Sequence, residues 1–163
     1  MTFRSTGVNT VMGTPTYSNT TDTNGLVTSV TYTIPVAVTS FGNTLYVGQS
    51  AELATAASAS NAFALVVETA ALPTTESVSA TTSITLSSSN ATVETNGYRL
   101  DDGVTKNFTI NVTMTRGTDN TSHRFRLDTI RTFTEGGLIS ANATNSDLLP
   151  TTNYRTDFRY INN

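Results

Sequence analysis

The chain has 163 residues, only 13% of them charged, and a formal net charge of −3. It contains no Cys, no Trp and one His, which excludes disulfide bonds, a cysteine nucleophile and a Cys/His zinc site. A single Lys and the acidic balance exclude a basic nucleic-acid-binding face. No apolar run approaches the ~20 residues that a membrane-spanning helix needs. We therefore expect neither a nucleic-acid partner nor insertion into a membrane.

Three polar residue types dominate the composition, with 35 Thr, 16 Ser and 15 Asn. Thr, like Val and Ile, is β-branched and suits a pleated strand better than a helix. The solvent-facing sides of the strands are therefore expected to be hydroxyl and amide surfaces. Such surfaces are common on secreted proteins. We expect an extracellular or cell-surface location, with the export signal absent from this sequence or already removed.

The first 17 residues contain few apolar side chains, and these follow no clear pattern: Phe3, Val8, Met12 and Tyr17. They are too sparse to hold the segment on the domain that follows. We therefore expect an extended N-terminal segment over residues 1–17, able to act as a donor strand, and a folded domain over residues 18–163. The four apolar side chains are the candidate assembly residues.

The clearest strand signal is Leu26–Phe41, where apolar residues alternate with Thr, Pro and Ala. Pro35 lacks a backbone donor, so this strand is expected at a sheet edge, or Pro35 at a bulge or strand switch. A short strand is expected over Thr44–Val47. The stretch Gln49–Ser60 is rich in Ala and Ser, and it is the one place where we expect a helical turn.

Further strands, separated by turn residues, are expected over Asn61–Thr69, Val78–Leu86, Val93–Leu100, Phe108–Thr115, Phe125–Ile130 and Tyr154–Tyr160. Asp101-Asp102-Gly103 is a strong turn signal. The alternation shifts between Leu127 and Ile130, which predicts a β-bulge. The last strand is expected to carry charged residues on one face and, on its core-facing side, Tyr154, Phe158 and Tyr160.

Together these signals predict an all-β fold. We expect a single β-sandwich of Ig-like or jelly-roll type, with about eight to ten short strands and little helix. No repeat of roughly 20–50 residues and no linker divides the chain, so one domain is expected.

Residues Tyr98–Thr113 resemble the Gly-x-x-x-x-Phe-Thr-Ile-x-Val-Thr start of a strand in bacterial Ig-like surface domains. Phe125-Arg126-Leu127 and the stretch Leu149–Phe158 look like closing strands of sandwich domains in bacterial and archaeal cell-surface proteins. The resemblance covers about residues 98–160. It implies a surface-layer, fibre or filament subunit, and it carries no catalytic residues.

The sequence offers no catalytic constellation, so we expect a non-enzymatic protein without a cofactor. His123, the only imidazole, is better explained as a structural residue at a strand end than as a hydrolase base. No Gly-x-Ser-x-Gly elbow is present. Asp101 and Asp102 precede a Gly and are better explained as turn residues than as a glycosidase pair.

Two acidic turns offer oxygen ligands for Ca²⁺, Asp22 with Asn24 and Asp101 with Asp102. Neither continues into the roughly twelve-residue calcium loop with its final Glu, and plain turns are the alternative.

Six Asn-x-Ser/Thr sequons are candidate glycosylation sites: Asn19, Asn90, Asn107, Asn111, Asn120 and Asn142. An intramolecular isopeptide or ester cross-link would have to use the only Lys, Lys106, or the only Gln, Gln49. Ordinary polar side chains are the alternative for both.

The function that we expect is a non-enzymatic structural subunit that assembles with copies of itself into an extracellular filament or surface lattice. Donor-strand exchange through an exposed sheet edge is the expected mechanism. The first alternative is a phage or virus coat, decoration or fibre subunit, so the partners would include cell-surface or virion components. The second is a carbohydrate-binding or adhesive module that stacks sugar rings on Tyr154 and Tyr160.

Overall fold

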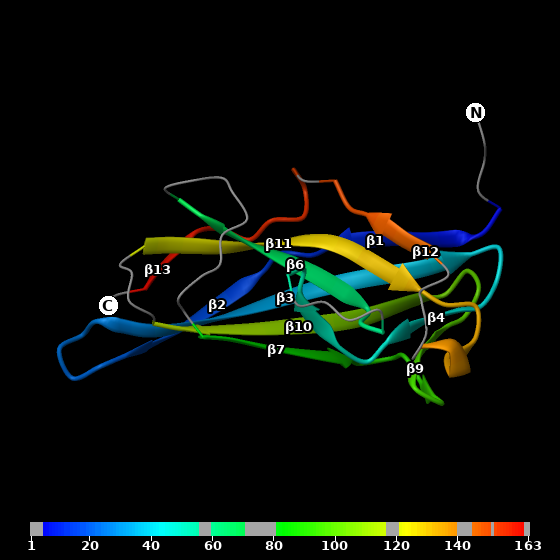
Figure 1. The fold of residues 1–163 in the computed structure, drawn as a ribbon, viewed down its shortest axis with the longest axis horizontal. Coiled ribbons are helices and arrows are strands. Elements are labelled where there is room, and N and C mark those ends of the chain that lie inside the picture. Colours follow the sequence, from blue (N-terminus) through cyan, green and yellow to red (C-terminus); the bar gives the residue numbers. More distant parts are fainter. Residues whose placement is uncertain are drawn as a thin grey trace.

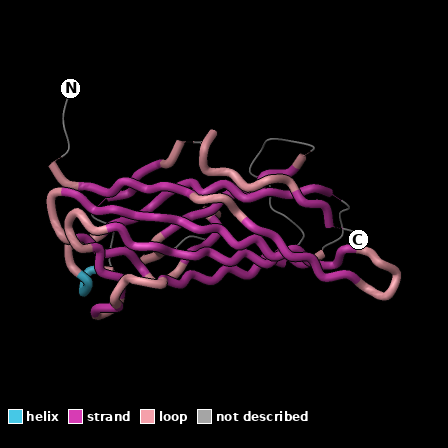
Figure 2. Tube along the Cα trace, turned by 180° about the vertical axis from the view of Figure 1, so that it is seen from behind, coloured by secondary structure: helices cyan, strands magenta, loops and turns pink. Residues whose placement is uncertain are grey.

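The computed structural model describes residues 5–55, 60–70, 81–116, 121–139, 145–150 and 152–161. The molecule is an elongated sandwich whose longest strands run roughly along the long axis (Figures 1 and 2). Sheet 1 has the strand order β1-β3-β10-β7, and β2 also pairs with β3. All of its pairs are antiparallel. Its strands are β1 (Gly7–Met12), β2 (Thr16–Thr21), β3 (Val27–Phe41), β7 (Thr81–Ser88) and β10 (Thr105–Thr115).

Sheet 2 has the order β12-β11-β6-β5, and β13 also pairs with β11. Its strands are β5 (Ala51–Leu53), β6 (Phe63–Thr69), β11 (Thr121–Thr132), β12 (Asn145–Leu148) and β13 (Arg159–Ile161). A small third sheet, β4-β9-β8, lies at one end of the sandwich, on the right in Figure 1. It consists of β4 (Leu45–Gly48), β8 (Val93–Glu94) and β9 (Gly97–Leu100), and the 3₁₀ turn η1 (Gly136–Leu138) contacts β9.

The core lies between the inner faces of sheets 1 and 2. Buried residues on β3 alternate with more exposed ones, and they are Val30, Tyr32, Ile34, Val36 and Val38. Strand β10 repeats this pattern with Phe108, Ile110, Val112 and Met114. Successive side chains of a strand point to opposite faces, so the period-two pattern of the sequence places one face of sheet 1 in the core.

Tyr32 links the two sheets directly. Its hydroxyl donates to the backbone oxygen of His123 on β11 at 2.8 Å, and its ring packs edge-on against Phe125 of the same strand. Burial raises the pKa of Tyr32, so this hydroxyl keeps its proton and remains a donor.

Pro35 lies at the place where the neighbour of β3 changes from β1 to β2. Met12, the last residue of β1, pairs with Val36, and Thr16, the first residue of β2, pairs with Thr33. Gly13 donates to the Pro35 oxygen at 2.8 Å. The missing N–H of Pro35 therefore points to the connection between the two strands, where no ladder partner is required. The predicted strand switch is confirmed, although β3 is an inner strand.

The predicted all-β sandwich is confirmed. The described residues form thirteen strands instead of eight to ten, because two- to four-residue strands such as β5, β8 and β13 pair with longer ones. The turn at Asp101–Gly103 is also confirmed, since Val104 donates to the Asp101 oxygen and Gly103 has a φ of +70°. The predicted bulge on β11 lies between Leu127 and Thr129, where the register with β6 shifts.

The helical turn predicted over Gln49–Ser60 is wrong where the structure describes it. Ala51–Leu53 is strand β5, which pairs in parallel with β6, and the Ala54 N–H donates to the Leu65 oxygen. Ala51 is buried. Pairing with β6 therefore overrides the weak helix preference of the Ala-rich stretch. Residues 56–59 lie outside the described residues.

The core-facing aromatic side predicted for the last strand is confirmed for Tyr154, which packs against the core, and is wrong for the other two aromatic residues. Phe158 and Tyr160 are 38% and 47% exposed, whereas Thr156 and Ile161 are buried. Tyr160 pairs with Ser122 of β11, and Ile161 pairs with Thr121. This register turns Tyr160 outward and leaves Ile161 to fill the core.

The N-terminal segment forms part of sheet 1, so the predicted boundary between residues 17 and 18 falls inside β2. Strand β1 pairs with β3 over six residues, and Val8, Met12 and Tyr17 pack against the core. Ladder hydrogen bonds add to the sparse apolar contacts and hold the segment on its own domain. Donation of β1 would therefore require it to leave β3. Phe3 lies outside the described residues.

Within the described ranges, no helix has the length and apolarity that crossing a lipid bilayer requires.

We predict that Tyr32→Phe lowers the free energy of unfolding by about 1 kcal/mol, because it removes the donor to the His123 oxygen in the core. For a domain of this size, the midpoint of thermal unfolding should fall by about 2–4 °C. Tyr160→Phe, at an exposed ring, is the matched control and should leave the midpoint unchanged. Equal midpoints for the two variants would show that the hydroxyl contributes nothing to the contact between the sheets.

Candidate assembly site

In the part of the chain that the structure describes, no further strand pairs with either edge of sheet 1. Among the described residues, β7 pairs only with β10, and β1 and β2 pair only with β3. These three strands contain no charged residue and no Pro. Soluble proteins normally protect sheet edges with charged side chains, Pro or a covering segment, because an unprotected edge recruits another strand.

The edge strands of sheet 2 differ in this respect. Each carries a charged side chain, Glu52 on β5, Asp147 on β12 and Arg159 on β13. Among the described edge strands of the two large sheets, only those of sheet 1 therefore lack a charged residue.

At each edge, one backbone hydrogen bond shows which residues turn their N–H and C=O groups away from the neighbouring strand. Gly13 bonds to Pro35, so in an antiparallel ladder the alternate residues Val8, Thr10 and Met12 turn their N–H and C=O groups away from β3. On the other side, Ser89 donates to the Asn107 oxygen. By the same alternation, the backbone groups of Thr82, Ile84 and Leu86 on β7 point away from β10.

One side chain reaches the β1 edge. The Tyr154 hydroxyl donates to the backbone oxygen of Thr10. A hollow of about 410 Å³ lies beside this contact, between β1 and β12, and its lining includes Val8, Ile130 and Leu149. At its rim, Leu148 is 79% exposed. The β1 edge is therefore bordered by open space as well as by Tyr154.

The predicted assembly residues on β1 and β2 face inward. Val8, Met12 and Tyr17 are half-buried against the core. The Tyr17 hydroxyl accepts from the Asp157 N–H at 2.9 Å, and the Arg159 guanidinium lies 3.9 Å above its ring. The sequence predicted assembly through an exposed sheet edge without indicating which edge, and on these strands the backbone groups that turn away from β3 form such an edge. Their lack of charge was visible in the sequence, but their edge position was not.

Most of the outer face of sheet 1 is a hydroxyl and amide surface, and the exposed Val11 beside Pro35 and Ala37 forms an apolar part of it. Cross-strand hydrogen bonds join Thr31 to Thr113 at 2.9 Å and Thr39 to Thr105 at 2.8 Å, and Thr33 donates to Asn111 at 2.9 Å. Sequence and register place no charged residue on this face of the described strands. The predicted Thr-rich outer face is confirmed.

The outer face of sheet 2 carries a charged cluster around Glu68, whose side chain is 7% exposed. Arg124 donates to one carboxylate oxygen at 2.6 Å, and Arg126 and Arg155 donate to the other at 3.2 and 3.1 Å. Arg126 also pairs with Asp128 at 2.5 Å. Burial alone would raise the pKa of Glu68, but the hydrogen bonds and charges of Arg124 and Arg155 outweigh it and lower the pKa below its usual value. This cluster ties β6, β11 and the segment before β13 together.

The structure does not bring the two candidate calcium turns together. Asp22 caps its own turn, since its Oδ1 accepts from the N–H groups of Asn24 and Leu26 at 2.8 and 3.0 Å. This turn joins β2 to β3 at the left of Figure 1, far from β9. Asp102 is exposed and forms a backbone bridge with Ser40. In the described part of the chain, no group of three or more metal-binding side chains gathers.

Asp101 engages Lys106 and Arg99, each at 2.8 Å. The hydrogen bond and charge of Lys106 lower the pKa of Asp101. This contact holds the Lys106 amine against a carboxylate, and the Asn90 contact of the amine is with the backbone oxygen at 3.5 Å. The geometry is that of an ion pair. It does not supply the Lys–Asn side-chain contact that an isopeptide would need.

The candidate glycosylation sites differ in how their amides are used. Asn19 and Asn107 are exposed, while the Asn111 oxygen accepts from Thr33. The Asn90 amide donates to the Thr105 oxygen at 3.1 Å and accepts from the Asn107 N–H at 2.7 Å. It therefore connects the loop after β7 to β10. Asn120 and Asn142 lie outside the described residues.

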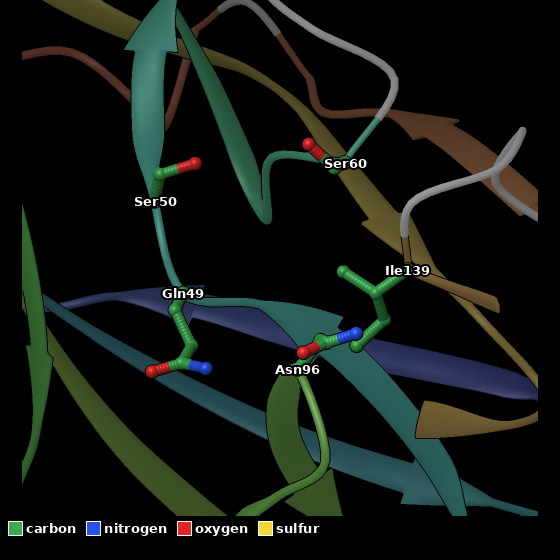
Figure 3. A pocket seen from close by; sticks show the side chains of 5 residues that line it. All are labelled: Gln49, Ser50, Ser60, Asn96 and Ile139. Carbon is green, nitrogen blue, oxygen red and sulfur yellow. The ribbon is translucent and has the colours of Figure 1, made fainter. Parts of the chain in front are cut away.

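A shallow hollow of about 340 Å³ lies near the small third sheet. Four of its lining residues are polar, Gln49, Ser50, Ser60 and Asn96, and Ile139 forms an apolar wall. Figure 3 shows the polar groups spread around the rim instead of converging on one point. His123, the only imidazole of the chain, is not among these lining residues, because it lies inside the sandwich with 3% of its surface exposed. The hollow therefore does not assemble an acid, a base and a nucleophile.

Comparison with protein-family models, with curated proteins and with solved structures found no match for this chain. The resemblance to cell-surface Ig-like domains stays a prediction.

We predict that Glu68→Gln lowers the free energy of unfolding at pH 7 by roughly 3 kcal/mol, because three arginines lose their shared carboxylate while Gln keeps an acceptor oxygen. The lowered pKa means that this carboxylate stabilises the fold above about pH 4.3, its ordinary pKa, and that the contribution disappears as the pH falls through the folded-state value. Urea unfolding of both proteins at pH 7 and at about pH 2 measures the effect.

Glu135→Gln, at an exposed position beside η1, is the matched control and should change the stability little. A Glu68→Gln loss that is as large at pH 2 as at pH 7 would contradict the electrostatic explanation.

Proposed function

We propose that the chain is a non-enzymatic structural subunit that assembles with copies of itself into an extracellular filament or surface lattice. The observation that carries this proposal is the absence of charge and Pro from both open edges of sheet 1, on β7 and on β1–β2. Natural monomers avoid such edges, because exposed backbone groups recruit further strands.

The two edges are different surfaces of one molecule. A contact between unlike surfaces of identical copies does not close on itself, and it repeats to give an open filament unless rotation closes a ring. The extracellular location is supported by the composition, since the outer face of sheet 1 exposes hydroxyls and amides in place of charges.

Donor-strand exchange is one route to such an assembly. It would require β1 to leave β3 of its own chain and pair with β3 of a neighbour, which exchanges one six-residue ladder for an equivalent one. If copies instead pair through their sheet edges with every strand in place, β1 does not have to leave β3.

We predict that the purified chain forms filaments or a two-dimensional lattice visible by negative-stain electron microscopy. Because the edges are uncharged, assembly should persist in about 1 M NaCl, where the Debye length is only about 3 Å. Sedimentation at low and high salt measures the assembled fraction. A chain that remains monomeric at all concentrations would refute the proposal, and a chain found only on virus particles would favour the virion alternative.

A further inference from the structure

We infer that copies of this chain add side by side, with β7 of one copy pairing antiparallel with the β1–β2 edge of the next, so that sheet 1 continues from copy to copy. This inference rests on the proposed function and names the two surfaces that would meet. Three features of sheet 1 carry it: the direction of its edge strands, the faces of their free residues and their position along the sheet.

The first feature is strand direction. From β2 through β3 and β10 to β7, each strand runs antiparallel to its neighbour. The two edges of the sheet therefore run in opposite directions. A second copy shifted sideways without inversion brings its β1–β2 edge against β7 in the antiparallel sense, and the alternation of the sheet is maintained across the contact.

The second feature is the face of sheet 1 that the side chains of the residues with outward backbone groups share. On β7, the residues with outward backbone groups are Thr82, Ile84 and Leu86, and Ile84 pairs with the fully buried Val112, so these side chains face the core side. At the other edge, Thr10 and Tyr17 pair with the buried Val38 and Tyr32 and face the same side.

Residues that exchange both hydrogen bonds in an antiparallel pair lie directly opposite each other on one face. Pairing β7 with β1–β2 therefore joins core-side residues to core-side residues. The Thr-rich outer face continues across the contact without a flip.

The third feature is position along the sheet. Ser83 pairs with Thr113, Thr113 pairs with Thr31, and Thr31 pairs with Ser18. Strands β7 and β2 thus lie at the same level on opposite edges. A sideways shift brings them together with no sliding along the strand.

A second copy is the occupant that these features favour. None of these edge strands contains a charged residue, both edges have backbone groups that no described strand pairs with, and their directions and faces match each other. An extended peptide from another protein would need only one edge, and it would leave this match between the two edges without a role.

The decisive experiment uses the absence of native Cys. In the double variant Ser18→Cys/Ser83→Cys, both substituted residues are exposed on the outer face of sheet 1. Two strands separate them within one chain, so they stand about 14 Å apart, three strand spacings, and cannot form an intramolecular disulfide. At the proposed contact they become non-hydrogen-bonded neighbours with Cα atoms about 4.5 Å apart, which suits a disulfide.

Oxidation should therefore give a ladder of covalent multimers on a denaturing gel without reductant. The control Thr109→Cys/Ser83→Cys, with one Cys on the central strand β10, should give no ladder. Dimers of the single variant Ser83→Cys would indicate a β7–β7 contact and would overturn the inference.

A second pair of variants tests the edge without cross-linking. In Ile84→Lys, the ammonium can reach water past the open edge of a monomer but is buried when another strand covers that edge. The concentration needed for assembly should rise at least tenfold. Thr85→Lys places the same charge one residue away on the outer face, which stays exposed, so its assembly should change less than about twofold.

The outcomes separate the two proposals. Filaments that form without a Cys ladder, and that tolerate Ile84→Lys as well as Thr85→Lys, would overturn edge addition and leave the structural function standing. A wild-type chain that never assembles would overturn both. The ladder-forming variant alters only the exposed Ser18 and Ser83, so the test holds even where Ile84→Lys does not fold.

Discussion

Strand β3 is the element on which the rest of the structure depends. Its backbone groups bond alternately to β10 on one side and to β1 and then β2 on the other. Its inner side chains form the sheet 1 half of the core, and Tyr32 carries the contact across to β11. A strand with partners on both sides and one buried face has no freedom of register, because a slip of one residue would put Thr in the core and Val in solvent.

The fold could be predicted where burial is one-sided and continuous. Strands β3 and β10 alternate without interruption, and both were predicted close to their observed limits. Strand β5 could not be predicted, since Ala51–Leu53 becomes a strand only through its pairing with β6. The same holds for the outward turn of Tyr160, which follows from its register with Ser122. In these places the partner, and not the local sequence, determines the conformation.

The surface features divide in the same way. The hydroxyl face of sheet 1 could be predicted, because each Thr on it alternates with a buried residue of the same strand. The Glu68 cluster could not, because its arginines come from β11 and from the segment before β13, far from Glu68 in sequence. Edge position likewise depends on the order of strands in the sheet. The sequence shows whether a strand contains charged residues, but it does not show whether that strand has a neighbour on both sides.

The position of Pro35 has a consequence for local stability. The ladder along this side of β3 is interrupted at residues 13–15, so β1 and β2 are two separate units of pairing on one strand. Loss of β1 breaks its six pairs with β3 and the Tyr154 contact with the Thr10 oxygen, and it removes Val8 and Met12 from the core, while β2 and its Tyr17 contact with Tyr32 remain in place. Proteins open preferentially in such contiguous units of low cost. The sandwich therefore has a point of partial opening at its first strand, where β1 can separate while β2 stays paired with β3.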